Sequence, residues 1–326
     1  MMFTPVNLIT GFLGSGKTTL LQRLLADPAL ADTAVLINEF GEVGLDHHLL
    51  DRIDETMVLL PSGCLCCTIR GELSAAIRDL YGRRERGEVP AFRRLAVEST
   101  GLADPFPILS TVQADPVLRH HFRWGNIVTT IDAVNGLSQL DRRPESVKQA
   151  AVADRLVLTK TDLVDVEVAD ALITRVRNLN PSAPLMRAAE EAIDADALLA
   201  HDIFATATRS EAARRWFAAE SSVEAHGAGV HAFALTLDDA VDWTRFGLWL
   251  TMLLNRHGDK VLRVKGMLNV EGSAAPVAIH GVQHLVHPPV HMAAWPDEKR
   301  HSRLVFIVDG LERAAIESSL RAFLRG

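Results

Sequence analysis

The stretch that decides the fold is Gly11-Phe12-Leu13-Gly14-Ser15-Gly16-Lys17-Thr18. It matches the pattern G-x-x-x-x-G-K-[ST] in full, follows a predicted strand and opens a predicted helix. Glycines let the backbone curl around phosphate oxygens, so that its N–H groups and the helix amino end face them. We expect Lys17 to bridge two phosphates and the Thr18 hydroxyl to bind Mg²⁺. The residues expected to contact the nucleotide here are Gly11, Gly14, Ser15, Gly16, Lys17, Thr18 and Thr19.

Around this loop, short β-branched runs alternate with helical patterns. Such alternation is typical of βαβ units, and it predicts an α/β fold: a P-loop NTPase with a mainly parallel sheet flanked by helices. The predicted strands are Pro5–Thr10, Thr33–Ile37, Arg94–Glu98, Asn126–Asp132, Arg155–Thr159 and Pro184–Arg187. The predicted helices are Lys17–Ala26, Ile69–Tyr81, Pro105–Gln113, Val147–Ala151, Val166–Leu179 and Ala195–Leu199.

The pattern weakens into Ala, Glu and Ser before a second patterned region begins. We therefore expect a P-loop domain at 1–205, a linker at 206–229 and a small α+β domain at 230–326. The small domain is predicted to hold strands at Val230–Leu237, Val261–Val270, Pro276–His280 and Leu304–Val308, and helices at Trp243–Asn255 and Leu311–Leu324.

Charge and composition exclude several classes of protein. The 326 residues carry 34 Lys+Arg against 41 Asp+Glu, a net charge of −7, which disfavours a nucleic-acid binder. No apolar run approaches the roughly 18 residues that span a bilayer, and the amino terminus lacks a secretory signal pattern. A cytoplasmic protein without nucleic-acid or membrane partners is expected.

Two strand-end motifs indicate which nucleotide is bound. Glu98 ends a predicted strand, where an NTPase holds the water shell of Mg²⁺, and Gly101 lets the backbone approach the γ-phosphate. Further along, Thr159-Lys160-Thr161-Asp162 ends another strand. The Asp162 carboxylate can accept two hydrogen bonds from guanine, which adenine cannot offer, and the stem of Lys160 can pack along the base. The competing interpretation is an ordinary polar turn.

All 3 cysteines fall within Cys64-Leu65-Cys66-Cys67. Thiolates are soft ligands for Zn²⁺, Co²⁺ or Fe²⁺, and the C-x-C spacing can bring two sulfurs to one ion. The alternatives are a buried apolar trio and a redox pair. Because three cysteines leave a tetrahedral site incomplete, we expect a fourth ligand.

Four motifs together resemble the CobW-like metallochaperone GTPases: Thr10–Thr19, Asn38–Gly44, Gly63–Cys67 and Glu98–Pro105. The region of Arg263–Gly266 and Trp295 is similar to that family's second domain. The resemblance implies a slow, metal-responsive GTPase that delivers zinc or a related metal to a client metalloprotein, and it implies a homodimer. The chain departs from the family in having Thr159 where Asn is usual, and only one histidine, His226, in 206–229.

The loop Asn38–Asp46 occupies the position of a GTPase switch. Its Glu39 and Glu42 are the carboxylates expected to complete the cysteine site, with water or a histidine as alternatives, His47-His48 among them. The hypothesis is that hydrolysis of GTP to GDP and phosphate rearranges this loop and releases the metal. The residue that orients the attacking water is left open among Glu39, Glu42 and Asp46.

The catalytic group is predicted to be Lys17, Thr18 and Glu98, acting on GTP with Mg²⁺. Two other functions stay open: a nucleotide-binding metal sensor or buffer without transfer, and a P-loop kinase acting on a small molecule. Four histidines of the second domain are interpreted as solvated or hydrogen-bonded groups at a sheet edge, rather than as a metal relay or a client-docking surface: His280, His284, His287 and His291.

Overall fold

The computed structural model describes residues 3–37, 57–59, 68–189, 194–199, 229–296 and 298–325. The chain divides into two compact units, Met1–Leu172 with Leu185–Ile203 and Ile173–Pro184 with Phe204–Gly326. Most of the predicted linker lies outside the described residues, so the predicted domain borders stay predictions.

The first unit is built on a parallel sheet of seven strands in the order β3-β2-β4-β1-β5-β6-β7. The strands are β1 (Thr4–Gly11), β2 (Thr33–Ile37), β3 (Met57–Leu59), β4 (Arg94–Glu98), β5 (Phe122–Asp132), β6 (Arg155–Thr159) and β7 (Leu185–Arg187). Every residue of β1 is buried, as expected of a central strand covered on both faces. The expected α/β fold class is confirmed.

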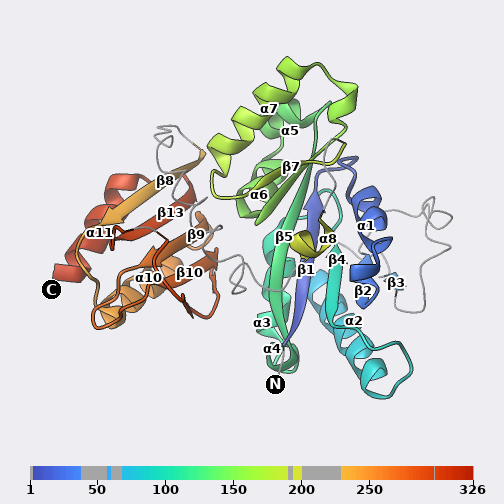
Figure 1. Cartoon of the computed structure of the whole chain (residues 1–326), viewed down its shortest axis with the longest axis horizontal. Coiled ribbons are helices and arrows are strands. Elements are labelled where there is room, and N and C mark those ends of the chain that lie inside the picture. Colours follow the sequence, from blue (N-terminus) through green and yellow to red (C-terminus); the bar gives the residue numbers. More distant parts are fainter. Residues whose placement is uncertain are drawn as a thin grey trace. The chain divides into compact units, whose positions relative to one another are not determined.

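Helices cover both faces of this sheet (Figure 1). They are α1 (Lys17–Leu25), α2 (Thr68–Glu85), α3 (Pro105–Ala114), α4 (Leu118–His121), α5 (Gly136–Arg142), α6 (Pro144–Val152), α7 (Val166–Leu179) and α8 (Ala195–Leu199), with the 3₁₀ turns η1 (Pro28–Leu30) and η3 (Thr161–Leu163). On one face, α1 and α8 bury Leu21 and Leu198 against Ile9 and Val128 of the strands. The helices α3 and α6 contact β5 as well.

The order of the central strands positions the candidate site. Because β4, β1, β5 and β6 are neighbours and parallel, the loops that leave their carboxyl ends converge. The register places Ile9 beside Glu98 and Gly11 beside Thr130.

The second unit is an antiparallel sheet in the order β11-β10-β9-β13-β8, with β12 paired to β10. Its strands are β8 (Val230–Leu237), β9 (Val261–Leu268), β10 (Val277–Val282), β11 (Leu285–Val286), β12 (Val290–His291) and β13 (Ser302–Asp309), and its helices are α10 (Trp243–His257) and α11 (Arg313–Arg325). The helices bury Trp249 and Leu320 with Phe306 of the sheet. The small α+β architecture is as predicted, with the tight turn after β10 placing His284 outside that strand.

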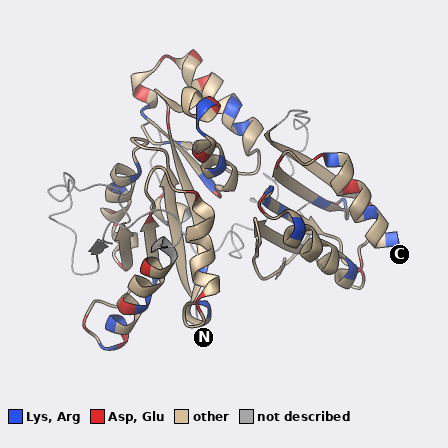
Figure 2. Cartoon of the chain, turned by 180° about the vertical axis from the view of Figure 1, so that it is seen from behind, with Lys and Arg blue, Asp and Glu red and all other residues tan. Residues whose placement is uncertain are grey.

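Charged side chains lie mainly on helices and connections, and the strands of the parallel sheet carry few of them (Figure 2). Among the described residues, no helix is both long enough and apolar enough to cross a membrane.

Candidate functional site

Three glycines shape the loop between β1 and α1. Gly14 and Gly16 have φ values of 71° and 86°, left-handed conformations that a side chain disfavours. At Gly11 a Cβ would collide with Thr130 of β5 and would lie 2.6 Å from Ser15 Oγ. The loop therefore curls tightly at the carboxyl end of the sheet, directly before a helix. A loop of this shape at a helix amino end is the arrangement that binds phosphate oxygens.

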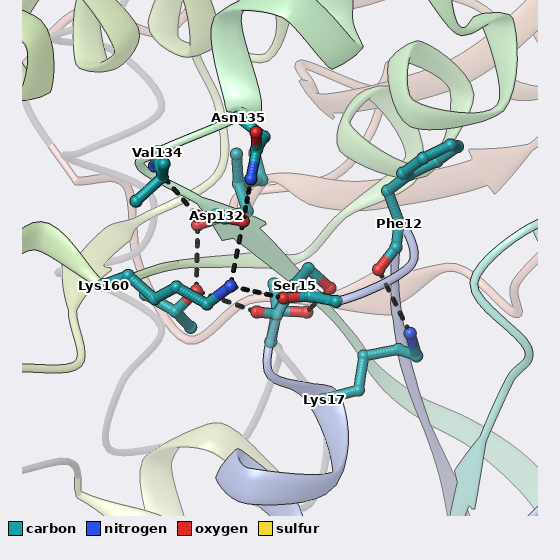
Figure 3. Close-up of polar contacts among 11 residues, drawn as sticks. Phe12, Ser15, Lys17, Asp132, Val134, Asn135 and Lys160 are labelled. Carbon is teal, nitrogen blue, oxygen red and sulfur yellow. Dashed lines mark hydrogen bonds and ion pairs between the residues drawn. The ribbon is translucent and has the colours of Figure 1, made fainter. Parts of the chain in front are cut away.

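Two side chains of the loop hold it in this shape. Ser15 Oγ lies 2.6 Å from Thr130 Oγ1, and both residues are buried. The Thr130 hydroxyl also donates to the carbonyl oxygen of Thr10, so the proton of the first bond comes from Ser15. Lys17 Nζ donates to the carbonyl oxygen of Phe12 at 3.2 Å (Figure 3). The Lys17 ammonium group is thus folded back over the loop.

The two groups expected to hold Mg²⁺ meet in the structure. Thr18 Oγ1 donates a hydrogen bond of 2.7 Å to Glu98 Oε1, although the residues are 80 positions apart. Glu98 is the last residue of β4 and is 4% exposed. A hydroxyl and a carboxylate oxygen are the hard donors that Mg²⁺ takes from proteins, so this pair fits that ion. Thr19, expected to contact the nucleotide, is exposed in the first turn of α1.

The loop after β4 lies against the phosphate loop at Gly101. A Cβ on Gly101 would lie 2.6 Å from Leu13 N and 2.7 Å from Leu13 Cα, so only glycine permits this approach. Leu13 is 52% exposed, so the contact lies at the surface of the phosphate loop. Gly101 therefore brings the loop after β4 against the phosphate loop, and its expected approach to the γ-phosphate stays a prediction.

Gln149 of α6 fastens that same loop, which the sequence did not indicate. Its Nε2 donates to the carbonyl oxygens of Gly101 at 3.2 Å and Ala103 at 3.0 Å, and the residue is fully buried. The backbone oxygen of Gln149 accepts a bond from Thr129 Oγ1 of β5. The loop after β4 is consequently tied to the sheet through one side chain.

The predicted base-reading residues lie at the carboxyl end of β6, which Thr159 closes. Thr159 Oγ1 donates to the carbonyl oxygen of Ser15 at 2.8 Å, so the hydroxyl that replaces the usual amide holds the phosphate loop. Lys160 has a positive φ of 58°, and its Nζ donates to the carbonyl oxygen of Gly14 at 2.8 Å. Asp162 is exposed on η3, where its carboxylate is accessible to a ligand. These residues, 159–162, form the base loop. Two hydrogen bonds join it to the phosphate loop, from Thr159 to Ser15 and from Lys160 to Gly14.

Asp132, the last residue of β5, is a further member of this site that the sequence did not indicate. Its carboxylate accepts bonds from the backbone N–H of Val134, from Asn135 Nδ2 and from Lys160 Nζ (Figure 3). Burial by itself raises the pKa of Asp132, but the hydrogen bonds from Asn135, Lys160 and Val134 and the charge of Lys160 outweigh it and hold that pKa below its ordinary value. The group is therefore an anion at neutral pH. Its position at the end of a strand beside β1 was the available signal.

Comparisons with known proteins show the family of the chain. A family model described as CobW/HypB/UreG, nucleotide-binding domain, matches residues 5–187, and one described as Cobalamin synthesis protein cobW C-terminal domain matches residues 230–324. The chain belongs to the CobW/HypB/UreG family. The resemblance found in the sequence motifs is thereby confirmed.

Relatives extend over nearly the whole chain. The zinc chaperone YjiA of Escherichia coli is 34% identical over 304 residues, which are 93% of each protein. The zinc chaperone CobW of Sinorhizobium sp is 28% identical over 353 residues, 98% of this chain and 97% of that protein. Among solved structures, the Zn(II)-bound YjiA GTPase from E. coli matches with a TM-score of 0.72 at 30% identity, over 100% of both chains.

The metal ligands predicted for this member of the CobW/HypB/UreG family lie outside the described residues. They are Cys64, Cys66, Cys67, Glu39 and Glu42, together with the alternatives His47 and His48. Their assignment stays a prediction.

In the described part of the chain, no group of three or more His, Cys, Asp or Glu is placed to hold a metal ion. The second-unit histidines include a stacked pair, His280 and His287, whose ring centroids are 4.4 Å apart. His280 itself is buried, and His284 lies in the turn after β10, outside the strand that holds His280. The reason is a local one: Gln283 adopts a positive φ of 50°, which ends the strand one residue earlier.

Proposed function

We propose that this protein is a GTPase that binds a transition metal, zinc first among them, and delivers it to a client metalloprotein. The observation that carries the GTPase part is the meeting of three elements at the carboxyl ends of β4, β1 and β6. They are the glycine-shaped phosphate loop, the hydrogen-bonded pair Thr18 and Glu98, and the base loop tied to Ser15. The names of the relatives, zinc chaperone and GTPase, support the same assignment.

Hydrolysis of GTP to GDP and phosphate is expected to rest on charge and position. In the structure, the Lys17 ammonium group donates a hydrogen bond to the carbonyl oxygen of Phe12. When GTP binds, Lys17 is expected to leave this acceptor and to pair with the phosphates. Thr18 and Glu98 would hold Mg²⁺, which would supply positive charge beside the transferring phosphoryl group. We expect slow turnover by the isolated protein, because the sequence shows no recognisable arginine finger.

Selectivity for guanine is assigned to the base loop. Asp162 is accessible and can accept hydrogen bonds from the N1–H and the exocyclic amine of guanine, whereas adenine offers no matching pair. Thr159 serves a different purpose: its hydroxyl proton is engaged by Ser15, so it holds the loop and leaves base reading to its neighbours. The replacement of the usual Asn is therefore compatible with guanine binding.

Metal transfer is the part of the proposal that rests on sequence and relatives. The ligands would be Cys64, Cys66 and Cys67 with a carboxylate from Glu39 or Glu42 of the switch-like loop. Coupling of that loop to the γ-phosphate would make metal affinity depend on the bound nucleotide, and the dependence would be reciprocal.

The GTPase part is tested by phosphate release from GTP and from ATP by the full-length protein, with and without Zn²⁺. Faster release from GTP, abolished in Lys17→Ala, is expected. A phosphorylated small molecule formed in cell extract in place of free phosphate would indicate a kinase. GTP binding without metal- or client-stimulated turnover would indicate a sensor or buffer.

The transfer part is tested by Zn²⁺ titration in the presence of a non-hydrolysable GTP analogue and in the presence of GDP. Tighter binding with the analogue, lost when the three cysteines are replaced by serine, is expected. Equal affinities within error would contradict nucleotide-controlled release. The client can be identified by capturing partners with the GTP-locked protein and analysing their metal content. Sedimentation then tests the proposed homodimer.

A further inference from the structure

The proposed mechanism does not use the buried carboxylate of Asp132. The residue is 1% exposed and ends β5, between the strand that leads into the phosphate loop and the strand that leads into the base loop. Oδ1 accepts from the backbone N–H of Val134 at 2.9 Å, and Oδ2 accepts from Asn135 Nδ2 at 2.9 Å. These two donors fix the plane of the carboxylate.

The third donor to Asp132 is Lys160, and it reaches out of the base loop. Lys160 Nζ lies 3.0 Å from Asp132 Oδ2 in an ion pair and 2.8 Å from the carbonyl oxygen of Gly14. Figure 3 shows the ammonium group between the strand end and the phosphate loop. The lysine side chain is still 37% exposed, which leaves part of its stem open to a ligand. Its nitrogen is therefore fixed while its stem stays accessible.

The backbone of Lys160 is held in an unfavourable conformation at the same place. Its φ of 58° belongs to the left-handed region, which a residue with a Cβ adopts at an energetic cost. The ion pair with Asp132 and the bond from Ala133 N to the Thr159 carbonyl oxygen, 2.9 Å, favour that conformation. Without the anion, the lysine would keep one hydrogen-bond acceptor and lose the partner that offsets the strain.

We propose that Asp132 is the positioning residue of the base loop: through Lys160 it sets the affinity for the guanine base and the preference for GTP over ATP. The inference rests on the proposed GTPase function and names a determinant of its selectivity. Asp132 touches neither the phosphate loop directly nor the Thr18–Glu98 pair in the described contacts. Its loss should therefore raise KM and leave kcat nearly unchanged.

The test is steady-state hydrolysis of GTP and ATP by the full-length protein and by Asp132→Asn, together with GDP titration. The amide keeps the size of the side chain and removes its charge. We expect KM for GTP and Kd for GDP to rise roughly tenfold, as for loss of one charge-assisted hydrogen bond, with kcat within about twofold. The ratio of kcat/KM for GTP over ATP should fall by a similar factor.

A double-mutant cycle separates positioning from a structural role. In a Lys160→Met background the charge of Asp132 has no partner in the base loop, so adding Asp132→Asn should change KM by less than about twofold. Asp154→Asn is the matched control, because Asp154 is fully buried and accepts from the N–H of Ile127, in the middle of β5, at 3.0 Å. It should lower the melting temperature without changing the GTP to ATP ratio.

Three results would overturn the inference: an unchanged KM in Asp132→Asn, a fall in kcat alone, or a full effect retained in the Lys160→Met background. If Asp132→Asn does not fold, Asn135→Ala removes one donor from the carboxylate at an exposed position and should raise KM for GTP about twofold to threefold. An unchanged KM in that variant overturns the inference too. A wild-type protein without preference for GTP would contradict the proposed function itself, whereas a retained preference in Asp132→Asn contradicts only the role of Asp132.

Discussion

The close approach of Gly101 to the phosphate loop gives the sharpest test of the site. In Gly101→Ala the new Cβ would lie 2.6 Å from Leu13 N and 2.7 Å from Leu13 Cα, whereas ordinary contact begins at 3.4 Å. One of the two loops must therefore move by about 0.8 Å. Gln149 holds the Gly101 side through two hydrogen bonds to backbone oxygens, so we expect the phosphate loop to give way.

The magnitude follows from the cost of overpacking. Forcing an extra methyl group into a closely packed place costs about 1–3 kcal/mol. If nucleotide binding must restore the original loop, that cost appears as a loss of affinity of about 5- to 140-fold. Equilibrium titration with a fluorescent GDP analogue measures it, and thermal melting measures any part of the strain already present without nucleotide.

A matched control is Gly247→Ala in α10. Nothing lies within 4 Å of a Cβ at that glycine, which is in a helix interior. We expect unchanged GDP affinity and a gain in stability of roughly 0.5–1 kcal/mol, the usual preference of a helix for alanine. Binding by Gly101→Ala within twofold of wild type, with an unchanged melting temperature, would refute the reasoning about the close approach.

Three further changes test other contacts of the first unit. Gln149→Met removes both hydrogen bonds to the loop after β4, so the free energy of unfolding in urea should fall by about 1–3 kcal/mol. Because that loop is expected to approach the γ-phosphate, GTP binding should weaken more than GDP binding. Thr159→Val leaves the Ser15 carbonyl oxygen without its donor and should weaken GDP binding about tenfold while the GTP to ATP ratio stays constant, as a competition titration would show. In Asp115, burial raises the pKa, but the bond from Ser74 and neighbouring N–H groups outweigh it and lower the pKa overall. The ionised carboxylate therefore stabilises the fold above its unfolded pKa, and this effect is lost as pH falls through the lower folded pKa. In urea titrations, the difference in unfolding free energy between wild type and Asp115→Asn should shrink in acid. A difference that stays constant with pH would contradict this.

Much of the fold was predictable because its signals are local. The run from Gly11 to Thr18 carries its own conformational demands, and the buried strands read as continuous apolar segments. The helix α5 was missed because it is 7 residues long and has no side-chain N-cap, so nothing in Gly136–Arg142 marks a start. The strands β11 and β12, at 2 residues each, are too short to show a period.

The candidate site was predictable only in part, for a related reason. Glu98 was expected near Thr18 because both follow parallel strands, and the structure brings their side chains together. The roles of Asp132 and Gln149 were not predicted, since Asp132 binds Lys160 and Gln149 binds Gly101 across 28 and 48 positions of the chain and no motif joins these residues.

The sequence by itself determined the phosphate loop, the parallel α/β sheet, the second domain and the cysteine cluster, since each depends on residue types at short spacing. Only the tertiary structure decided that Thr159 holds the phosphate loop and that Asp132 fixes Lys160. Both results depend on which strands become neighbours and on which carbonyl oxygens their loops then present. Pairing of that kind arises from the packing of the whole sheet, and no short segment of the sequence encodes it.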